Sequence, residues 1–517
     1  MTMAKGLDTE KASPVKKELE RPVIKITNGI PRHPLWRMAE PVSLEINRGE
    51  QIAIAGGNAA GKSRLVEILT GHYPLLRNEV HYDFSPSTLP LVSDNLKYIS
   101  FRDSYGDQDG TYYYQQRWNQ HDISDDMPTV ARLLGIVNDE PGTDTPPSPA
   151  LYYSTLLNLR SSFSKRIISL SSGELRKFQM VKVLATNPRV LVLDNPFIGL
   201  DAAARRDFRG LLETLTRRTE LLVILVFSRR GDIPDFITHV LPVEGMKLLP
   251  KMTLAGFRRK YAAATPPKLK DEVRRWIANL PSSPSLTTPA APCMAREIIR
   301  FRDVSISYGG HTILKHVSWT VHEGERWALS GRNGSGKSTL LSLVCADNPQ
   351  AYACDIELFG HRRGTGESIW EIKRRIGYVS PEMHRAYLKD IPAIDVVASG
   401  LCDSVGLYVR PRPEQRQSCL DWMRVFGIEA LADRSFLQLS SGEQRLCLLV
   451  RAFVKDPELL VLDEPLHGLD DQGGCLVRQI VEQFCLRPHK TLVFVTHYEE
   501  ELPRGITHRL CLDSTGA

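Results

Sequence analysis

The feature that most constrains this chain is an internal duplication, because three motifs occur twice in the same order. GGNAAGKS, LSSGE and VLVLDNPFIGLD in the first half return as GRNGSGKS, LSSGE and LLVLDEPLHGLD in the second. From the second motif onward, each residue of the first copy is separated from its counterpart in the second copy by the same number of positions, as for Gly173 and Gly442 or Asp194 and Asp463. This repeat indicates two homologous domains, and the 517 residues are enough for two or three domains of roughly 100 to 200 residues each.

Each copy predicts an α/β domain built on a parallel sheet. A short apolar strand leads into a Gly-rich turn and a helix, and a later helix is followed by another buried strand. The later helices have apolar side chains at helical spacing, so one face of each should belong to the core. These side chains are Leu175, Phe178, Val181 and Leu184 in the first copy and Leu446, Leu449, Val450 and Phe453 in the second.

Changes in composition divide the chain into four parts. A basic amphipathic stretch over 268–280 runs into PSSPSLTTPAAP at 281–292, and sequence this rich in Pro and Ser is typical of a linker. We therefore predict a disordered tail over 1–21, a first domain over 22–260, a linker over 261–296 and a second domain over 297–517.

Composition also restricts the classes of protein to which the chain can belong. No run reaches the ~18 consecutive apolar residues that cross a bilayer, so a membrane role would need another chain to supply the spans. The N-terminal residues mix lysines with acids, unlike organelle presequences, and the nine cysteines lie in the second half without metal-ligand spacing. We predict a cytoplasmic protein, free or peripheral on a membrane, with an organelle as the open alternative. The net charge of +6 forms no like-charged block, so nucleic acid is not an expected partner.

The first repeated motif has the form GxxxxGK[ST] between a strand and a helix, which is the pattern of a phosphate-binding loop. Its glycines let backbone N–H groups converge on phosphate oxygens, and the helix N-terminus adds its positive dipole end. We expect Lys62 and Lys337 to reach the β- and γ-phosphates of a nucleotide, and the hydroxyls of the next residues to bind Mg²⁺. The predicted nucleotide-binding residues are Gly56, Gly57, Asn58, Ala59, Ala60, Gly61, Lys62, Ser63 and Arg64 in the first copy and Gly331, Arg332, Asn333, Gly334, Ser335, Gly336, Lys337, Ser338 and Thr339 in the second.

The third motif ends a predicted buried strand in an acid, which would hold Mg²⁺ through water beside the phosphate loop. In the second copy Glu464 follows this acid, and a carboxylate next to the γ-phosphate can deprotonate the attacking water. The first copy has Asn195 at that position, and an amide is no base. We therefore predict Glu464 as the catalytic base. The predicted metal ligands are Ser63, Asp194, Ser338 and Asp463.

The order of these motifs over nearly the whole chain resembles that of the ATP-binding-cassette family. The resemblance implies that each domain has a RecA-like core, an antiparallel β subdomain and a helical subdomain, and that ATP and Mg²⁺ are required. It also implies head-to-tail pairing of the domains within one chain, with each ATP between one domain's phosphate loop and the other's LSSGE signature. The signature residues Ser171, Ser172 and Gly173 would then face the ATP on Lys337, and Ser440, Ser441 and Gly442 the ATP on Lys62.

The resemblance assigns two further roles. His497 corresponds to the family's switch histidine and is the second predicted catalytic residue, whereas the first copy has Ser228 at the equivalent position. Tyr308 stands where the family stacks an aromatic ring on adenine, and the first copy offers His33 or Trp36 nearby. The two ATP sites should therefore differ.

Within this family the chain is similar to the ModF-like group, duplicated ATPases named for their association with molybdate-transport genes. The similarity rests on the sequence over 358–380 and on YYYQQRWN at 112–119, which either touches a nucleotide or partner or packs inside the helical subdomain. At the family's Q-loop position, Pro381 and Glu382 replace the glutamine. How these domains would sense a transmembrane partner is thus open.

Two functions follow from this sequence. The first is an energy-coupling ATPase that hydrolyses ATP mainly at the Lys337 site and serves a transport or remodelling system whose transmembrane or effector subunit is a separate chain. The alternative is a translation or ribosome-associated factor of the tandem cassette type. Such factors have a long charged helical linker and two intact glutamates, and both features are missing here. A nucleotide sensor without turnover is disfavoured because Glu464 and His497 complete one site.

Overall fold

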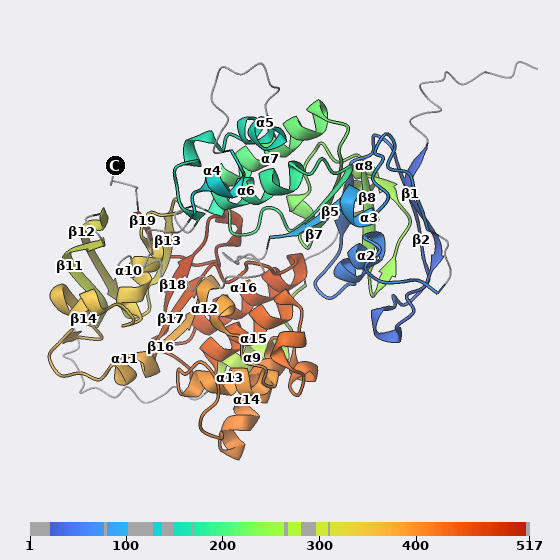
Figure 1. Ribbon diagram of the computed structural model, residues 1–517. Helices are drawn as coiled ribbons and strands as arrows, with labels where there is room; N and C mark the ends of the chain where they lie inside the picture. Colours follow the sequence, from blue (N-terminus) through green and yellow to red (C-terminus); the bar gives the residue numbers. More distant parts are fainter. Residues whose placement is uncertain are drawn as a thin grey trace, which may run out of the picture.

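The computed structural model describes residues 21–76, 80–101, 128–136, 148–167, 170, 172–262, 267–280, 296–308 and 311–512. The chain folds into two α/β units that lie against each other, one from each copy of the repeat (Figure 1). Each unit combines one mainly parallel sheet, one smaller antiparallel sheet and a set of helices. Both predicted phosphate loops belong to the parallel sheets.

The first unit has a three-stranded antiparallel sheet of order β2-β1-β4 and a larger sheet of order β10-β8-β3-β7-β6-β5, with β9 paired to β8. The strands are β1 (Pro22–Gly29), β2 (Val42–Asn47), β3 (Ile52–Ala55), β4 (Val80–Tyr82), β5 (Leu96–Ser100), β6 (Val190–Asp194), β7 (Leu222–Phe227), β8 (His239–Glu244), β9 (Lys247–Leu248) and β10 (Met252–Thr253). The helices are α2 (Lys62–Leu69), α3 (Val92–Asn95), α4 (Val130–Leu133), α5 (Pro149–Leu156), α6 (Ser172–Leu184), α7 (Ala202–Arg218) and α8 (Leu254–Tyr261).

The second unit repeats this plan with an antiparallel sheet of order β12-β11-β14-β15 and a parallel sheet of order β16-β17-β18-β13-β19. The strands are β11 (Glu297–Tyr308), β12 (His311–His322), β13 (Arg326–Gly331), β14 (Asp355–Leu358), β15 (His361–Arg362), β16 (Ile376–Val379), β17 (Leu459–Asp463), β18 (Thr491–Val495) and β19 (His508–Leu512). The helices are α10 (Lys337–Val344), α11 (Ile369–Arg375), α12 (Pro381–Ala386), α13 (Ala393–Ala398), α14 (Pro413–Val425), α15 (Ser441–Phe453) and α16 (Asp471–Cys485).

The parallel sheets have the same strand order in both units, since β5-β6-β7-β3-β8 corresponds to β16-β17-β18-β13-β19. β3 and β7 are buried at every position because they lie in the middle of the sheet with both faces covered. The strand before each phosphate loop is separated by one strand from the strand that ends in an acid. Because parallel strands end at one edge of the sheet, the loop and the acid meet there, at the usual ligand-binding edge of such folds.

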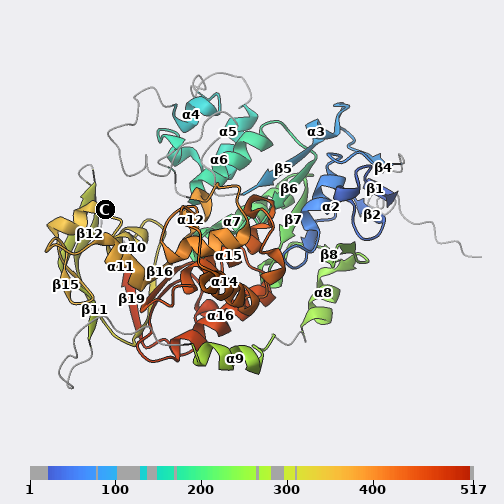
Figure 2. The same cartoon turned by 90° about the horizontal axis from the view of Figure 1, so that it is seen from below.

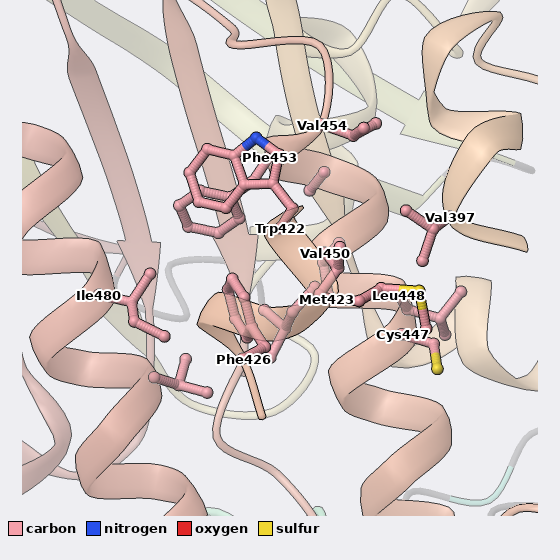
Figure 3. Packing of buried hydrophobic residues seen from close by; sticks show 14 of the residues in the cluster. Val397, Trp422, Met423, Phe426, Cys447, Leu448, Val450, Phe453, Val454 and Ile480 are labelled. Carbon is pink, nitrogen blue, oxygen red and sulfur yellow. The ribbon is translucent and has the colours of Figure 1, made fainter. Parts of the chain in front are cut away.

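The helices of the second unit pack through a cluster of large aromatic side chains between α14, α15 and α16 (Figure 3). The ring centroid of Phe453 lies 5.3 Å from that of Trp422 and 5.0 Å from that of Phe484. The predicted apolar faces are confirmed, since all of the named side chains are buried except Leu446, which is partly buried. The α/β fold class with two tandem units is confirmed as well.

Part of the predicted linker is folded. Helix α9 (Asp271–Ala278) lies against the second unit beside α16 (Figure 2). Ile277 is fully buried, and the ring of Trp276 meets that of Trp422 edge to face at 5.2 Å. The N–H of Leu269 donates to Oε1 of Gln479 at 2.8 Å. The stretch 267–280 is therefore attached to the second unit, and 281–295 lies outside the described residues.

None of the helices in the described part of the chain has both the length and the apolar character that crossing a bilayer requires. Most of the predicted tail, residues 1–20, lies outside the described residues, as does the segment at 112–119.

Candidate functional site

Both phosphate loops lead directly into a helix whose first residue is the motif lysine, Lys62 in α2 and Lys337 in α10. The preceding glycines, Gly61 and Gly336, have φ of 108° and 91°, a left-handed conformation that suits glycine. Neither helix has a side-chain cap on its N-terminus. The first amides of both helices are therefore open to a phosphate group.

The two lysines fold back over their own loops. Lys62 Nζ donates to the carbonyl oxygens of Gly56 at 3.0 Å and Gly57 at 2.7 Å, and Lys337 Nζ donates to those of Gly331 and Arg332, both at 2.8 Å. Burial lowers the pKa of Lys62 to about 8, against the opposing effect of nearby acids, and burial also lowers the pKa of Lys337. A bound phosphate would favour the charged form of each lysine. The loops thus fit the phosphates of a nucleotide.

The acids at the ends of β6 and β17 have different surroundings. Asp194 accepts hydrogen bonds from Tyr98 Oη at 3.1 Å and from the amide of Asn195 at 2.9 Å. Asp463 is buried, and its pKa is raised by that burial and by the carboxylates of Glu382 and Glu464. Within the described residues, no three His, Cys, Asp or Glu side chains lie close enough together to hold a metal ion by themselves. A Mg²⁺ ion here would depend on phosphate oxygens and water beside Ser338 and Asp463, and the predicted metal ligands stay predictions.

The two predicted catalytic residues lie together. Nε2 of His497 is 3.1 Å from Oε1 of Glu464, and both side chains are largely buried. Burial raises the pKa of Glu464, but the hydrogen bond to His497 and the charge of His467 outweigh it and bring the pKa to about 2. The carboxylate is therefore ionised and able to accept a proton.

Glu464 and Asn195 have the same backbone conformation, with φ of 46° and 48°. Asparagine tolerates this left-handed region, whereas a longer side chain such as glutamate is seldom found there. The backbone at the end of the two equivalent strands therefore has the same handedness. The difference between the two sites lies in the chemistry of the side chain.

Sequence reasoning missed a buried arginine that braces the second site. Arg445 is 1% exposed and lies on α15, within the stretch that follows the signature. Its guanidinium donates to the carbonyl oxygens of Ser380 at 2.9 Å, Asp463 at 2.9 Å and Glu464 at 2.7 Å. Arg176, at the equivalent place in α6, donates to the carbonyl of Pro196. An arginine in a helical stripe gives no signal of burial in the sequence.

At the interface, the phosphate loop of each unit contacts the GLD loop of the other unit. The backbone N–H of Asn58, in the first phosphate loop, donates to Oδ2 of Asp470 at 2.7 Å, and its side chain donates to the carbonyl of Gly468 at 3.0 Å. In the other direction, the N–H of Asn333 donates to Oδ2 of Asp201 at 3.1 Å. Both aspartates belong to the repeated GLD sequence. That repetition was the available signal for their role.

Only the second of the two predicted contacts between a signature and the opposite phosphate loop is seen in the described residues. A Cβ added to Gly442 would lie 1.9 Å from Nδ2 of Asn58, so the second signature lies directly on the first phosphate loop. A Cβ on Gly173 would instead meet Ala204 of its own unit at 3.7 Å. Ser171 lies outside the described residues, and Ser172 begins α6. The predicted roles of the signature residues in holding ATP remain predictions.

Beside the second phosphate loop, the interface encloses open space. A cavity of about 340 Å³ is lined from the first unit by Asp201 and Arg206 and from the second unit by Gly331, Arg332 and His497. The Lys337 loop therefore faces a cavity to which both units contribute.

The candidates for adenine stacking are aromatic side chains with partners of their own. Tyr308 is partly buried, and its hydroxyl accepts a hydrogen bond from Asn348 Nδ2 at 2.8 Å. Trp36 stacks on Tyr73 with ring centroids 4.6 Å apart, and His33 lies 4.8 Å from Trp36. Their part in binding adenine stays a prediction.

We expect Gly442→Ala to weaken ATP binding at the Lys62 site, because the added methyl group would displace the Asn58 amide from its bond to Gly468. Overpacking of this kind costs about 1–3 kcal/mol. The matched control is Gly173→Ala, which creates an ordinary contact at 3.7 Å. Titration with a fluorescent ATP analogue measures the effect. Equal affinities in the two variants would contradict the role given to Gly442.

The chain is similar to proteins of one known family. A family model described as "ABC transporter" matches residues 39–198 and 314–467. The ABC transporter ATP-binding protein ModF of Escherichia coli (strain K12) is 35% identical over 90% of this chain and 92% of its own length. An uncharacterized ABC transporter ATP-binding protein of Schizosaccharomyces pombe is 29% identical over 93% of this chain and 96% of its own length.

Two solved structures share the fold of nearly the whole chain. The archaeal ribosome recycling factor aABCE1, in complex with the stalk protein aP1, aligns with a TM-score of 0.51 and 17% identity over 91% of this chain and 84% of its own. The RNase-L inhibitor aligns with a TM-score of 0.50 and 16% identity over 91% of this chain and 84% of its own. At this level of identity the likeness concerns the fold alone.

Proposed function

Since the chain belongs to the family of ABC transporter ATPases and has that family's domain twice, we propose that it binds two ATP–Mg²⁺ complexes between its units and hydrolyses ATP mainly at the Lys337 site. One observation carries the proposal. Glu464 is paired with His497 at 3.1 Å, whereas Asn195 donates its amide to the neighbouring Asp194. Only the second copy therefore has a base at the end of its acidic strand.

The residues of the second site divide the work of hydrolysis. Lys337 and the open amides of α10 would hold the β- and γ-phosphates, while Ser338 and Asp463 would hold Mg²⁺, which neutralises phosphate charge when bound. Glu464 would accept a proton from the attacking water, with His497 holding the carboxylate and the water in line. At the first site Asn195 has no lone pair basic enough to accept that proton at neutral pH. The Lys62 site would then retain ATP and keep the units together.

Single-turnover hydrolysis of labelled ATP tests this proposal. The wild-type chain should bind two nucleotides and rapidly cleave about one of them, since the site without a base loses the ~10² to 10⁴-fold that general-base assistance contributes. Lys337→Ala should abolish the rapid phase. Its matched variant Lys62→Ala should keep cleavage at the Lys337 site. Rapid cleavage of both nucleotides, or of the one bound at the Lys62 site, would refute the assignment.

We further propose that the work of hydrolysis is passed to a separate transmembrane or effector subunit. Large apolar side chains are exposed in the segment that follows the Q-loop position, namely Leu388 (69%), Val405 (46%), Tyr408 (75%) and Val409 (67%). They belong to neighbouring loops, since a Cβ added to Gly406 would lie 3.8 Å from side-chain atoms of both Lys389 and Tyr408. Exposed apolar groups gathered in this way are typical of a binding surface.

Affinity purification with ATP tests for this partner. The Glu464→Gln chain should retain a specific protein, and Leu388→Ser combined with Tyr408→Ser should release it without changing single-turnover hydrolysis. A captured chain with membrane spans would support transport, and a soluble chain would support remodelling. Capture that is equal with and without the two serine substitutions would refute the surface.

The alternative, a ribosome-associated factor, is less well supported because α9 is short and packs on the second unit instead of forming an extended arm. We expect ribosomes or RNA at physiological salt to raise ATP turnover less than about tenfold, since contacts to phosphate backbones weaken steeply with salt. Steady-state ATPase assays with and without purified ribosomes measure this. Stronger stimulation would favour the alternative.

A further inference from the structure

We propose that the first unit positions the switch histidine of the second site through Arg229, the residue after Ser228 where the first copy lacks its own histidine. The inference rests on the proposed function, because it concerns hydrolysis at the Lys337 site. By the register of the repeat, Arg229 corresponds to Tyr498, and Asp232 corresponds to Glu501. The two equivalent loops face each other across the interface.

The link between the loops begins at a buried carboxylate. Glu501 is 5% exposed, and its Oε1 accepts a hydrogen bond from Nη1 of Arg229 at 2.5 Å. Its other oxygen accepts from the hydroxyl of Thr496 at 2.6 Å. The same hydroxyl accepts the N–H of Tyr498 at 3.1 Å. Arg229 is therefore connected, through Glu501, to both residues that flank His497.

A second link holds Tyr498 itself. Its hydroxyl donates to the carbonyl of Leu200 at 3.2 Å, in the GLD loop of the first unit. The guanidinium carbon of Arg205 lies 5.3 Å from the centre of its ring, and that of Arg229 lies 5.9 Å away. Arg205 is fixed in turn by Asp232 at 2.5 Å. Two cations of the first unit thus surround the residue next to His497.

This bracing fixes the backbone from which the ring of His497 reaches Glu464. A cavity of about 50 Å³ lies between Asn195, Ser228, Glu464 and His497, which is room for a few water molecules. Because this side of the histidine is open, a shift of its backbone would move the ring away from Glu464. This support is given in one direction only. The pair equivalent to Arg229 and Glu501 is Tyr498 and Asp232, and it contains no cation. The copy without the histidine therefore supplies the support for the copy that has it.

The test is whether Arg229 acts through His497. At saturating ATP, Arg229→Gln should lower the single-turnover rate about 10- to 100-fold, as expected for a misplaced catalytic group. The ATP concentration that gives half of the maximal rate should change less than about threefold. Arg229→Lys should recover most of the rate, because it restores the cation. In a His497→Ala background, Arg229→Gln should have an effect of less than about twofold. Arg217→Gln, in an exposed ion pair with Glu213, is the control and should behave as wild type.

Two results would overturn the inference: an unchanged rate in Arg229→Gln, or an equal loss with and without His497. If Arg229→Gln does not fold, Tyr498→Phe is tested in the same way with and without His497, since it keeps the ring and removes the contacts of the hydroxyl with Leu200 and Arg205. Failure of the proposed function would look different. In that case Glu464→Gln would hydrolyse ATP as fast as wild type. If instead Glu464→Gln is inactive and Arg229→Gln has the wild-type rate, the proposed function stands and only the positioning role is refuted.

Discussion

Replacing Glu464 by Gln is expected to lower ATP turnover of the whole chain about 10² to 10⁴-fold while leaving ATP binding intact. The amide keeps the size of the side chain and its place beside His497, but it cannot accept a proton from water. Single-turnover cleavage of labelled ATP measures the rate, and equilibrium binding measures the affinity.

The matched control is Asn195→Gln at the equivalent position of the first copy. Both residues have a left-handed backbone at the end of the acidic strand, so the two substitutions place the same side chain on the same backbone conformation. Turnover should change little in this control. If Glu464→Gln keeps most of the activity, another residue must supply the base, and the two sites are not divided as proposed.

The second large effect is expected from Arg445→Met, which should lower the free energy of unfolding of the second unit by about 3–5 kcal/mol. Burial lowers the pKa of Arg445 to about 10, so the guanidinium is still charged at neutral pH and binds backbone carbonyls of the Q-loop segment and the acidic strand. Removing it leaves those buried acceptors without their donor. Urea unfolding, followed by the fluorescence of the buried Trp422, measures the loss.

The control for this prediction is Arg424→Met on α14. Arg424 is 59% exposed and pairs with Asp421 and Glu429 at the surface. Surface ion pairs of this kind contribute little to stability, so the free energy of unfolding should hardly change. Equal losses in the two variants would mean that Arg445 acts as an ordinary surface arginine and that the Q-loop segment is held by other contacts.

The sequence by itself determined the two-unit plan and the start of each phosphate-loop helix. These features depend on local chemistry: glycines that accept a left-handed backbone, a lysine at a helix start and apolar runs that form central strands. The duplication added the register that matched Glu464 to Asn195 and His497 to Ser228. Such matches need no knowledge of the fold beyond the repeat.

The packing of the linker region was not predictable from its local sequence. Its composition predicted a linker over 261–296, with an amphipathic stretch over 268–280 ahead of the Pro-rich part at 281–292. Trp276 and Ile277 nevertheless attach α9 to the second unit, because both side chains pack against its core and remove apolar surface from water.

Tertiary structure decided which side chains meet across the interface. Asn58 binds Asp470, and Arg229 binds Glu501, although hundreds of residues separate the partners of each pair. The sequence contains these residues but gives no sign of the pairing, since an arginine or aspartate after a strand looks the same whether it faces solvent or another unit. Only the packing of the two units removes water from Glu501 and makes one arginine its partner.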